Sequence, residues 1–168
     1  MINVSIKNDT AKLQRRLKCL RYLATHKVDV GLPSSASARS KFLMAIHEHG
    51  SPIMNIPARP VIEPGLHQPE TQAAMAEAMT AGLAAAMAGD EAGTKASLEK
   101  ADQAGADGIR AYIDSGSLPG NAPMTIHGGW FRNPVSKKPV KVEGKGFDKP
   151  LVETGELYNS FSYELKSK

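Results

Sequence analysis

Two helical segments in the middle of the chain limit what it can fold into. Residues 70–88 are rich in alanine, the residue that most favours helix, and Pro69 suits the first position of a helix. Large apolar side chains recur in this segment at every fourth position, at Met75, Met79, Leu83 and Met87. Gly89 ends this helix, and a second helix is predicted over residues 94–114. The fold therefore contains two long consecutive helices.

The side chains of these helices indicate how they pack. We interpret the methionine stripe as part of the core, with a binding groove as the alternative. Gly105 and Gly108 lie inside the second helix, where each costs roughly 1 kcal/mol relative to alanine. Glycines at such positions indicate that another backbone approaches closely. Because only 5% of the residues are aromatic, we expect a thin core, or one that partner subunits complete.

The remaining periodicities predict a small sheet and a further helix. Apolar and polar residues alternate over residues 2–6, 28–32 and 161–165, as they do in half-buried strands. Between the first two strands, helical spacing predicts an amphipathic helix with an apolar face of Leu13, Leu17, Leu20 and Ala24. Residues 38–49 fit either a helix or a strand. The sequence predicts one α+β domain over residues 1–168: a small antiparallel or mixed sheet packed against two to three helices, with long extended loops or arms.

Proline and glycine mark the segments that we expect to contact partners. Pro57 and Pro60 make residues 53–62 extended, at a sheet edge or in an arm. Arg59 carries five fixed donors, which suit either a carboxylate on a neighbour or a clamp on its own arm. Residues 128–150, rich in glycine, proline and lysine, are predicted to form a long mobile loop or a hairpin.

Further interface candidates lie in this loop and near the end of the chain. Trp130 and Phe131 are large aromatic residues in a flexible context, which makes them candidate anchors, although local packing over the sheet explains them equally well. Thr154 and Gly155 are expected to form the turn that returns the last strand to the sheet. The full set of interface candidates is Pro57, Arg59, Pro60, Trp130, Phe131, Thr154, Gly155 and Leu157.

Charge and cysteine content restrict the cellular setting. The net charge is +4, with basic residues clustered over residues 12–27 and 137–149. Such clusters suit contact with nucleic acid or an acidic protein ring, although a solvated face is the commoner outcome. Cys19 is the one cysteine, which excludes an intrachain disulfide. No segment is apolar enough to span a membrane, so we expect the protein to be made and kept in a cytoplasm.

The histidine cluster at residues 47–49 is the strongest candidate for chemistry. On a strand, His47 and His49 would face the same side and could share a metal. Zinc hydrolases, however, need histidines four residues apart on a helix, and this spacing does not meet that pattern. We predict no enzyme activity, no cofactor and no metal. A metal-dependent hydrolase that uses His47 and His49 is a remote alternative.

The order of the motifs resembles that of a bacteriophage protein family. The matching segments are a basic N-terminal helix, residues 28–31, 46–50 and 56–60, an alanine-rich helical region, and residues 121–126 and 150–157 with a closing strand. In order and spacing they are similar to the small neck or tail-completion proteins of long-tailed phages and prophages, of the minor tail protein Z type. The chain departs from this family at His49, where an aromatic residue is usual. It departs again where Gly128-Gly129-Trp130 replaces a lysine-bearing segment.

The resemblance implies a structural virion protein that forms a ring, a hexamer, where the tail tube meets the head connector. It implies contacts with further copies of the chain, with tail terminator or tail tube proteins, and with head connector or stopper proteins. It also implies proximity to the genome DNA, no membrane partner, and assembly in the cytoplasm of the bacterial host. A tail terminator that caps the tube is the alternative, and a non-specific DNA-binding module is a more remote one.

Overall fold

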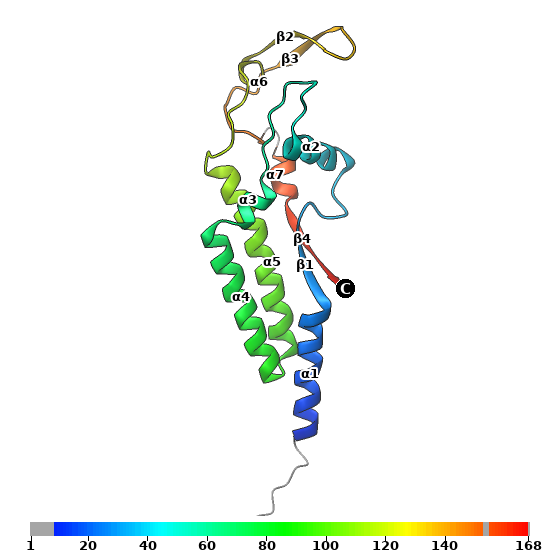
Figure 1. Cartoon of the computed structure of the whole chain (residues 1–168), viewed down its shortest axis with the longest axis vertical. Helices are drawn as coiled ribbons and strands as arrows, with labels where there is room; N and C mark the ends of the chain where they lie inside the picture. Colours follow the sequence, from blue (N-terminus) through cyan, green and yellow to red (C-terminus); the bar gives the residue numbers. More distant parts are fainter. Residues whose placement is uncertain (1–8, 153–154, 168) are drawn as a thin grey trace, which may run out of the picture.

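The computed structural model describes residues 9–152 and 155–167 of the 168-residue chain. The molecule is elongated, with a helical body at one end and a hairpin at the other (Figure 1). The body contains α1 (Asp9–Thr25), α4 (Pro69–Ala88) and α5 (Glu91–Asp114). Strands β1 (His26–Gly31) and β4 (Ser162–Ser167) run beside α5. The other elements are α2 (Ala38–His49), α3 (Ile62–Leu66), α6 (Pro123–His127), β2 (Gly128–Arg132), β3 (Pro139–Glu143) and α7 (Glu156–Ser160).

Two small antiparallel sheets accompany these helices and confirm the predicted α+β class. Strand β1 pairs with β4, so that Val30 lies opposite Tyr163. Strand β2 pairs with β3 in a hairpin that places Trp130 opposite Lys141. The predicted strands at residues 28–32 and 161–165 are therefore confirmed. The strand predicted over residues 2–6 lies outside the described residues.

Helices α4 and α5 pack against each other through small residues. The buried side of α4 consists of Thr71, Ala78, Gly82 and Ala86. A Cβ atom added to Gly108 of α5 would lie 2.8 Å from the Cβ of Thr71, closer than real Cβ contacts allow. A Cβ on Gly82 would lie 3.1 Å from the Cβ of Ser97. Both predicted helices are confirmed. Gly108 marks a close approach, but the side chain of Thr71 meets it instead of the backbone that was predicted.

Helix α5 is the central element of the fold. On its other sides, a Cβ on Gly105 would lie 2.9 Å from a methyl group of Val30, and one on Gly65 of α3 would lie 2.7 Å from the Cα of Ile109. The core lies between α5 and the surrounding segments, where Val61, Ile109 and Phe161 are completely buried. Because neighbours approach the backbone of α5 so closely, its glycines cannot be replaced without moving them.

The methionine stripe of α4 does not lie in the core, so its interpretation as core was wrong. Met79, Leu83 and Met87 are 44%, 52% and 53% exposed. The reason is the small-residue contact with α5, in which Thr71, Ala78, Gly82 and Ala86 occupy the packed side of α4. The large side chains are consequently turned to solvent.

In helix α1, too, the face that was predicted to be buried is exposed. Its predicted apolar face is largely outside, with Leu13 55% and Leu17 42% exposed. The helix packs instead through Cys19, which is 2% exposed, and through Leu23, whose Cδ2 lies next to Gly82 of α4. Helical spacing located the helix correctly, but the side that faces the core was predicted wrongly.

The segment around the two prolines differs from the prediction. Ser51 and Ile56 form an isolated bridge, residues 57–61 have no regular structure, and α3 begins at Ile62. The expected place at a sheet edge is not found, because the backbone N–H of Arg59 donates instead to the carbonyl of His47 at 2.6 Å. That bond satisfies one of the free carbonyls at the end of α2.

Residues 38–49, which fit two patterns, form helix α2. The side chain of Ser37 accepts a hydrogen bond from the backbone of Ser40 at the N-terminus. Gly50 ends the helix with φ of 71°. Both residues are ordinary capping signals.

We expect the Gly108→Ala variant to be less stable than the parent by roughly 1–3 kcal/mol, because the new methyl group overlaps Thr71 at the tightest part of the α4–α5 contact. This loss exceeds the helix-propensity gain of about 1 kcal/mol. Chemical denaturation measures it. Gly82→Ala is the matched control: its neighbour at 3.1 Å needs only a small shift, so its stability should stay close to that of the parent. Equal stabilities of the two variants would contradict the packing described here.

Candidate functional site

Arg59 links the proline arm, residues 57–61, to the loop that follows α5. The residue is 6% exposed, and its guanidinium donates from Nε to the carbonyl of Pro119 at 2.8 Å and from Nη2 to that of Gly120 at 2.7 Å. Burial lowers the pKa of the guanidinium, an effect that the carboxylate of Asp148 opposes. Of the two roles considered for Arg59, the geometry matches a clamp on its own chain.

The loop held by Arg59 is also held from the hairpin side. Asp148 accepts hydrogen bonds from the backbone N–H and the side-chain amide of Asn121, at 2.7 and 2.8 Å. These bonds, and then the nearby cations, lower the pKa of Asp148. The arm, the loop after α5 and the base of the hairpin are therefore joined by polar contacts in place of a continuous sheet.

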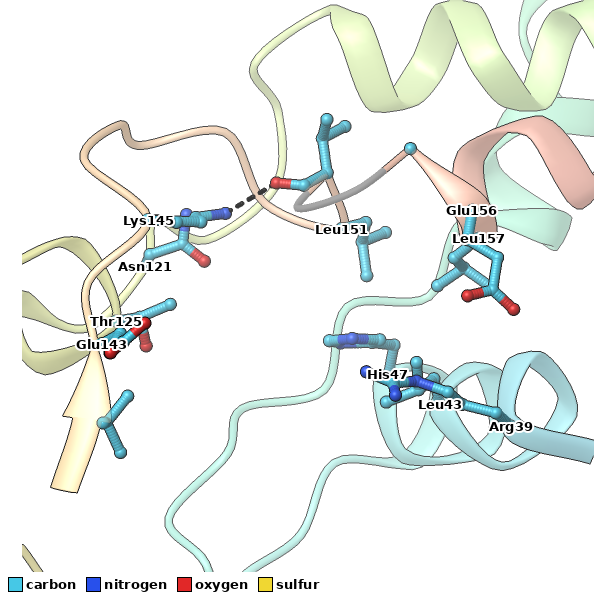
Figure 2. A pocket seen from close by; sticks show the side chains of 13 residues that line it. Arg39, Leu43, His47, Asn121, Thr125, Glu143, Lys145, Leu151, Glu156 and Leu157 are labelled. Carbon is cyan, nitrogen blue, oxygen red and sulfur yellow. Dashed lines mark hydrogen bonds between the residues drawn. The ribbon is translucent and has the colours of Figure 1, made fainter. Parts of the chain in front are cut away.

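A cleft of about 190 Å³ opens next to this junction, between α2, α7 and the base of the hairpin. Figure 2 shows His47 and Leu43 of α2 on one wall, with Lys145 and Leu151 across from them. Lys145 donates to the carbonyl of Val152 at 3.0 Å. Glu156 accepts from the hydroxyl groups of Ser37 and Ser40 at 3.1 and 3.2 Å. Lys145 and Glu156, which line the cleft, are thus hydrogen-bonded to other residues of the same chain.

His47 is the residue of this cleft with the most perturbed acid–base behaviour. Burial, followed by the charges of Arg59 and Lys145, lowers its pKa to about 4. Its Nδ1 is buried and has no hydrogen-bond partner among the described residues. The imidazole is therefore neutral at neutral pH, and it lines the cleft without contributing a charge.

The arrangement around His47 does not match a metal site. Residues 47–49 belong to a helix, so His47 and His49 point to different sides instead of the same side. His47 is partly buried while His49 is exposed. In the described part of the chain, no three histidine, cysteine, aspartate or glutamate side chains lie close enough together to hold a metal ion.

The β2–β3 hairpin presents large apolar and basic side chains to solvent at the end of the molecule opposite α1 (Figure 1). Trp130 is 67% exposed and Val135 is 72% exposed, whereas Phe131 is partly buried. The exposed basic residues of the hairpin are Arg132, Lys137, Lys138 and Lys141. An exposed tryptophan with cations beside it is typical of a contact surface.

The other interface candidates occupy different environments. Pro57 and Pro60 are exposed on both sides of the buried Arg59. Leu157 is 6% exposed and belongs to the core. Gly155 has φ of 79°, in the left-handed region that favours glycine, and directly precedes α7. Thr154 lies outside the described residues. The candidates thus divide into exposed residues and residues that hold the framework.

The reasoning from sequence missed the roles of two carboxylates, the half-buried Glu48 and the buried Asp102. Glu48 accepts from the backbone N–H groups of Val61 and Ile62, both at 3.2 Å, at the start of α3. Asp102 is completely buried in α5, and neither of its oxygens has a hydrogen-bond partner among the described residues. Burial, and then the charge of Glu99, raises the pKa of Asp102 to about 6. Its position on the packed face of α5, three residues before Gly105, was the available signal.

The comparisons with known proteins identify no relative. No protein-family model, no curated protein and no solved structure matches the chain. None of the helices in the described part of the chain has the length and apolar character needed to cross a bilayer.

We expect Arg59→Lys to destabilise the protein by about 1–3 kcal/mol, because an ammonium group cannot reproduce the two hydrogen bonds to neighbouring carbonyls from a buried position. Chemical denaturation measures the loss. Arg132→Lys is the matched control, since Arg132 also donates to a backbone carbonyl, that of Lys137, but is exposed. The clamp would be refuted if both variants were as stable as the parent.

His47 and Asp102 should give opposite pH dependences of stability. The pKa of Asp102 is about 6 in the fold and near 3.8 when unfolded, so the folded state holds its proton more tightly and stability falls as pH rises through this window. The pKa of His47 is about 4 in the fold and near 6.5 when unfolded, so stability rises with pH between these values. Each difference corresponds to roughly 3 kcal/mol.

Single substitutions should separate the two effects. Relative to the parent, Asp102→Asn should make the free energy of unfolding rise more steeply between pH 4 and 6.5. The reason is that the opposing contribution of Asp102 is removed and that of His47 remains. His47→Gln should make it rise less steeply, or fall, over the same range. Denaturant titrations at several pH values measure the slopes, and the double variant should return toward the slope of the parent. Parallel curves for all four proteins would contradict both assignments.

Proposed function

We propose that the chain is a structural subunit of the neck of a tailed-phage virion, a completion-ring subunit that joins the tail tube to the head connector. It acts in the virion, after assembly in the cytoplasm of the bacterial host. Its partners are further copies of itself in a hexameric ring, tail terminator or tail tube proteins on one side, and connector or stopper proteins on the other. The proposal rests on the ordered motifs described above together with the surface of the fold.

The observation that carries this proposal is the packing of α4, which exposes large apolar side chains and buries small ones. Met79, Leu83 and Met87 are each more than two-fifths exposed, while the smaller Ala78, Gly82 and Ala86 of the same helix are buried. A protein that acts alone rarely leaves such a row of large apolar side chains in water, and contiguous exposed apolar surface marks sites of association. A subunit that is completed by neighbours has a use for this face.

Two further features support an assembly role. The hairpin extends from the body and presents Trp130, a residue type enriched in the centres of protein interfaces. The arm at residues 57–61 is already held by Arg59, so little entropy is lost when Pro57 and Pro60 meet a partner. In the His47 cleft, by comparison, Lys145 and Glu156 form hydrogen bonds within the chain.

Deletion of the gene from its phage tests this function. We expect tails of normal length that fail to join to filled heads, which electron microscopy of the lysate would reveal. The same chain supplied from a plasmid should restore joined particles. Over-long tails would instead identify a tail terminator. Complete infectious particles from the deletion phage would contradict both structural roles.

A further inference from the structure

The exposed side of α4 is almost free of charge. Over its 20 residues α4 carries two charged side chains, Glu70 and Glu77, and no basic one. Its outward row of Met79, Leu83 and Met87 is flanked by exposed alanines and by Thr80. Solvent-facing helices normally carry charged residues on this side. The surface formed by this row is therefore apolar and uncharged, because Glu70 and Glu77 lie on a different side of the helix.

The exposed side of α1 has the complementary character. Leu13 and Leu17 are 55% and 42% exposed, and Leu20 continues the row at helical spacing. Five basic residues lie on the same 17-residue helix, at Lys12, Arg15, Arg16, Lys18 and Arg21. Arg16 and Arg21 border the leucine row at helical spacing, whereas Arg15 and Lys18 lie on the opposite side, so this surface is apolar with basic margins. Lys18 already pairs with Glu91 of the same chain, at 2.7 Å.

We propose that the Met79–Leu83–Met87 face of α4 in one copy packs against the Leu13–Leu17 face of α1 in the next copy. The inference rests on the proposed function, because it names the seam between neighbouring subunits of the ring. Two different faces of the chain meet at this seam, so the contact is of the head-to-tail kind, which continues from copy to copy until a ring closes.

Both faces are available at the same time. Within one chain, α1 meets α4 through Leu23, which lies next to Gly82, and through Arg15 and Arg16, which lie next to Gly89, and α4 meets α5 through Gly82 and its small neighbours. Neither contact uses the leucine row of α1 or the outer row of α4. A copy can therefore keep its own fold while it receives a neighbour on each side.

Charge and size both suit a second copy as the occupant. Helix α4 carries two carboxylates and no cation, whereas α1 carries five basic residues, so that a contact between α1 and α4 avoids the like-charge repulsion of a contact between two α1 helices. Helix α1 is about 25 Å long and about 10 Å wide, which gives a footprint of about 250 Å². Stable pairs bury about 800 Å² per partner. One seam is thus weak alone, and closure of a ring with two seams per copy stabilises it.

Cross-linking between differently labelled copies tests the seam. Two full-length proteins are made, Leu17→Cys and Leu83→Cys, both at exposed positions that the fold does not need. They are mixed at high concentration with a short bismaleimide. We expect a cross-linked dimer of the two proteins in the mixture and at least a tenfold lower yield from either protein alone. The parent protein, whose Cys19 is buried, gives the background.

Control variants use the other sides of the same helices. Ala11→Cys and Ala81→Cys are exposed positions that do not belong to either row, and their mixture should stay at background. A Leu83→Cys protein that also carries Met87→Lys should lose the cross-link, because a cation then faces the basic helix. Ala81→Lys in its place should leave the cross-link unchanged.

The outcomes separate this inference from the proposed function. Equal yields from the row pair and the control pair would overturn the seam, even where sedimentation reveals oligomers. A cross-link from Leu83→Cys alone would replace it with a contact between two α4 helices. The deletion phage described above tests the neck role by a different measurement, so failure of one leaves the other standing.

Discussion

The close contact between α4 and α5 is the constraint on which the rest of the structure depends. Thr71 meets Gly108 and Gly82 meets Ser97 at distances that leave no room for an added methyl group without movement. Two helices that approach this closely must do so through small side chains, whatever larger side chains they carry elsewhere. Helix α5 extends the same principle to its other neighbours, since Gly65 of α3 lies against the backbone of Ile109 and Gly105 lies against Val30 of β1. The body is therefore assembled around one backbone instead of around a large aromatic core, in agreement with an aromatic content of 5%.

Arginine side chains take the place of extensive sheet pairing in the rest of the molecule. Arg59 donates to the carbonyls of Pro119 and Gly120, and Arg110 of α5 donates to the carbonyl of Phe161 just before β4. In both cases a guanidinium satisfies carbonyls of irregular backbone that a sheet would otherwise have paired. Such links fix a few points and leave the segments between them free to follow the surface. This explains how the described part of the chain, with two sheets of two strands each, keeps its loops in defined places.

Reasoning from sequence located most elements but did not identify which sides of them are buried. The helices at α4 and α5 and the strands β1 and β4 follow from propensity and period, which are local properties. Residues 38–49 fitted two patterns, and the capping residues Ser37 and Gly50 were the signal that favours a helix. The buried faces of α1 and α4 were predicted wrongly because periodicity assigns large apolar residues to the core. That assumption fails where small residues give a closer helix contact. The clamp by Arg59 was among the roles considered, but its partners lie 60 and 61 residues away, beyond the reach of any local pattern.

The exposed apolar rows of α1 and α4 connect this packing to the proposed role in assembly. Apolar side chains that stay in water in both the folded and the unfolded chain contribute little burial free energy, whereas covering them with a neighbour gains about 25 cal/mol for each Å² removed from water. Polar residues at Met79, Leu83 and Met87 would not disturb the contact with α5, because these positions do not take part in it. The fold therefore does not require the large apolar residues at these positions, which agrees with the proposed contact between copies. Methionine suits such a role, since its flexible side chain adapts to a neighbour whose surface is not fully complementary. On this argument, the small-residue contact that holds α4 to α5 is also what frees the opposite face for another subunit.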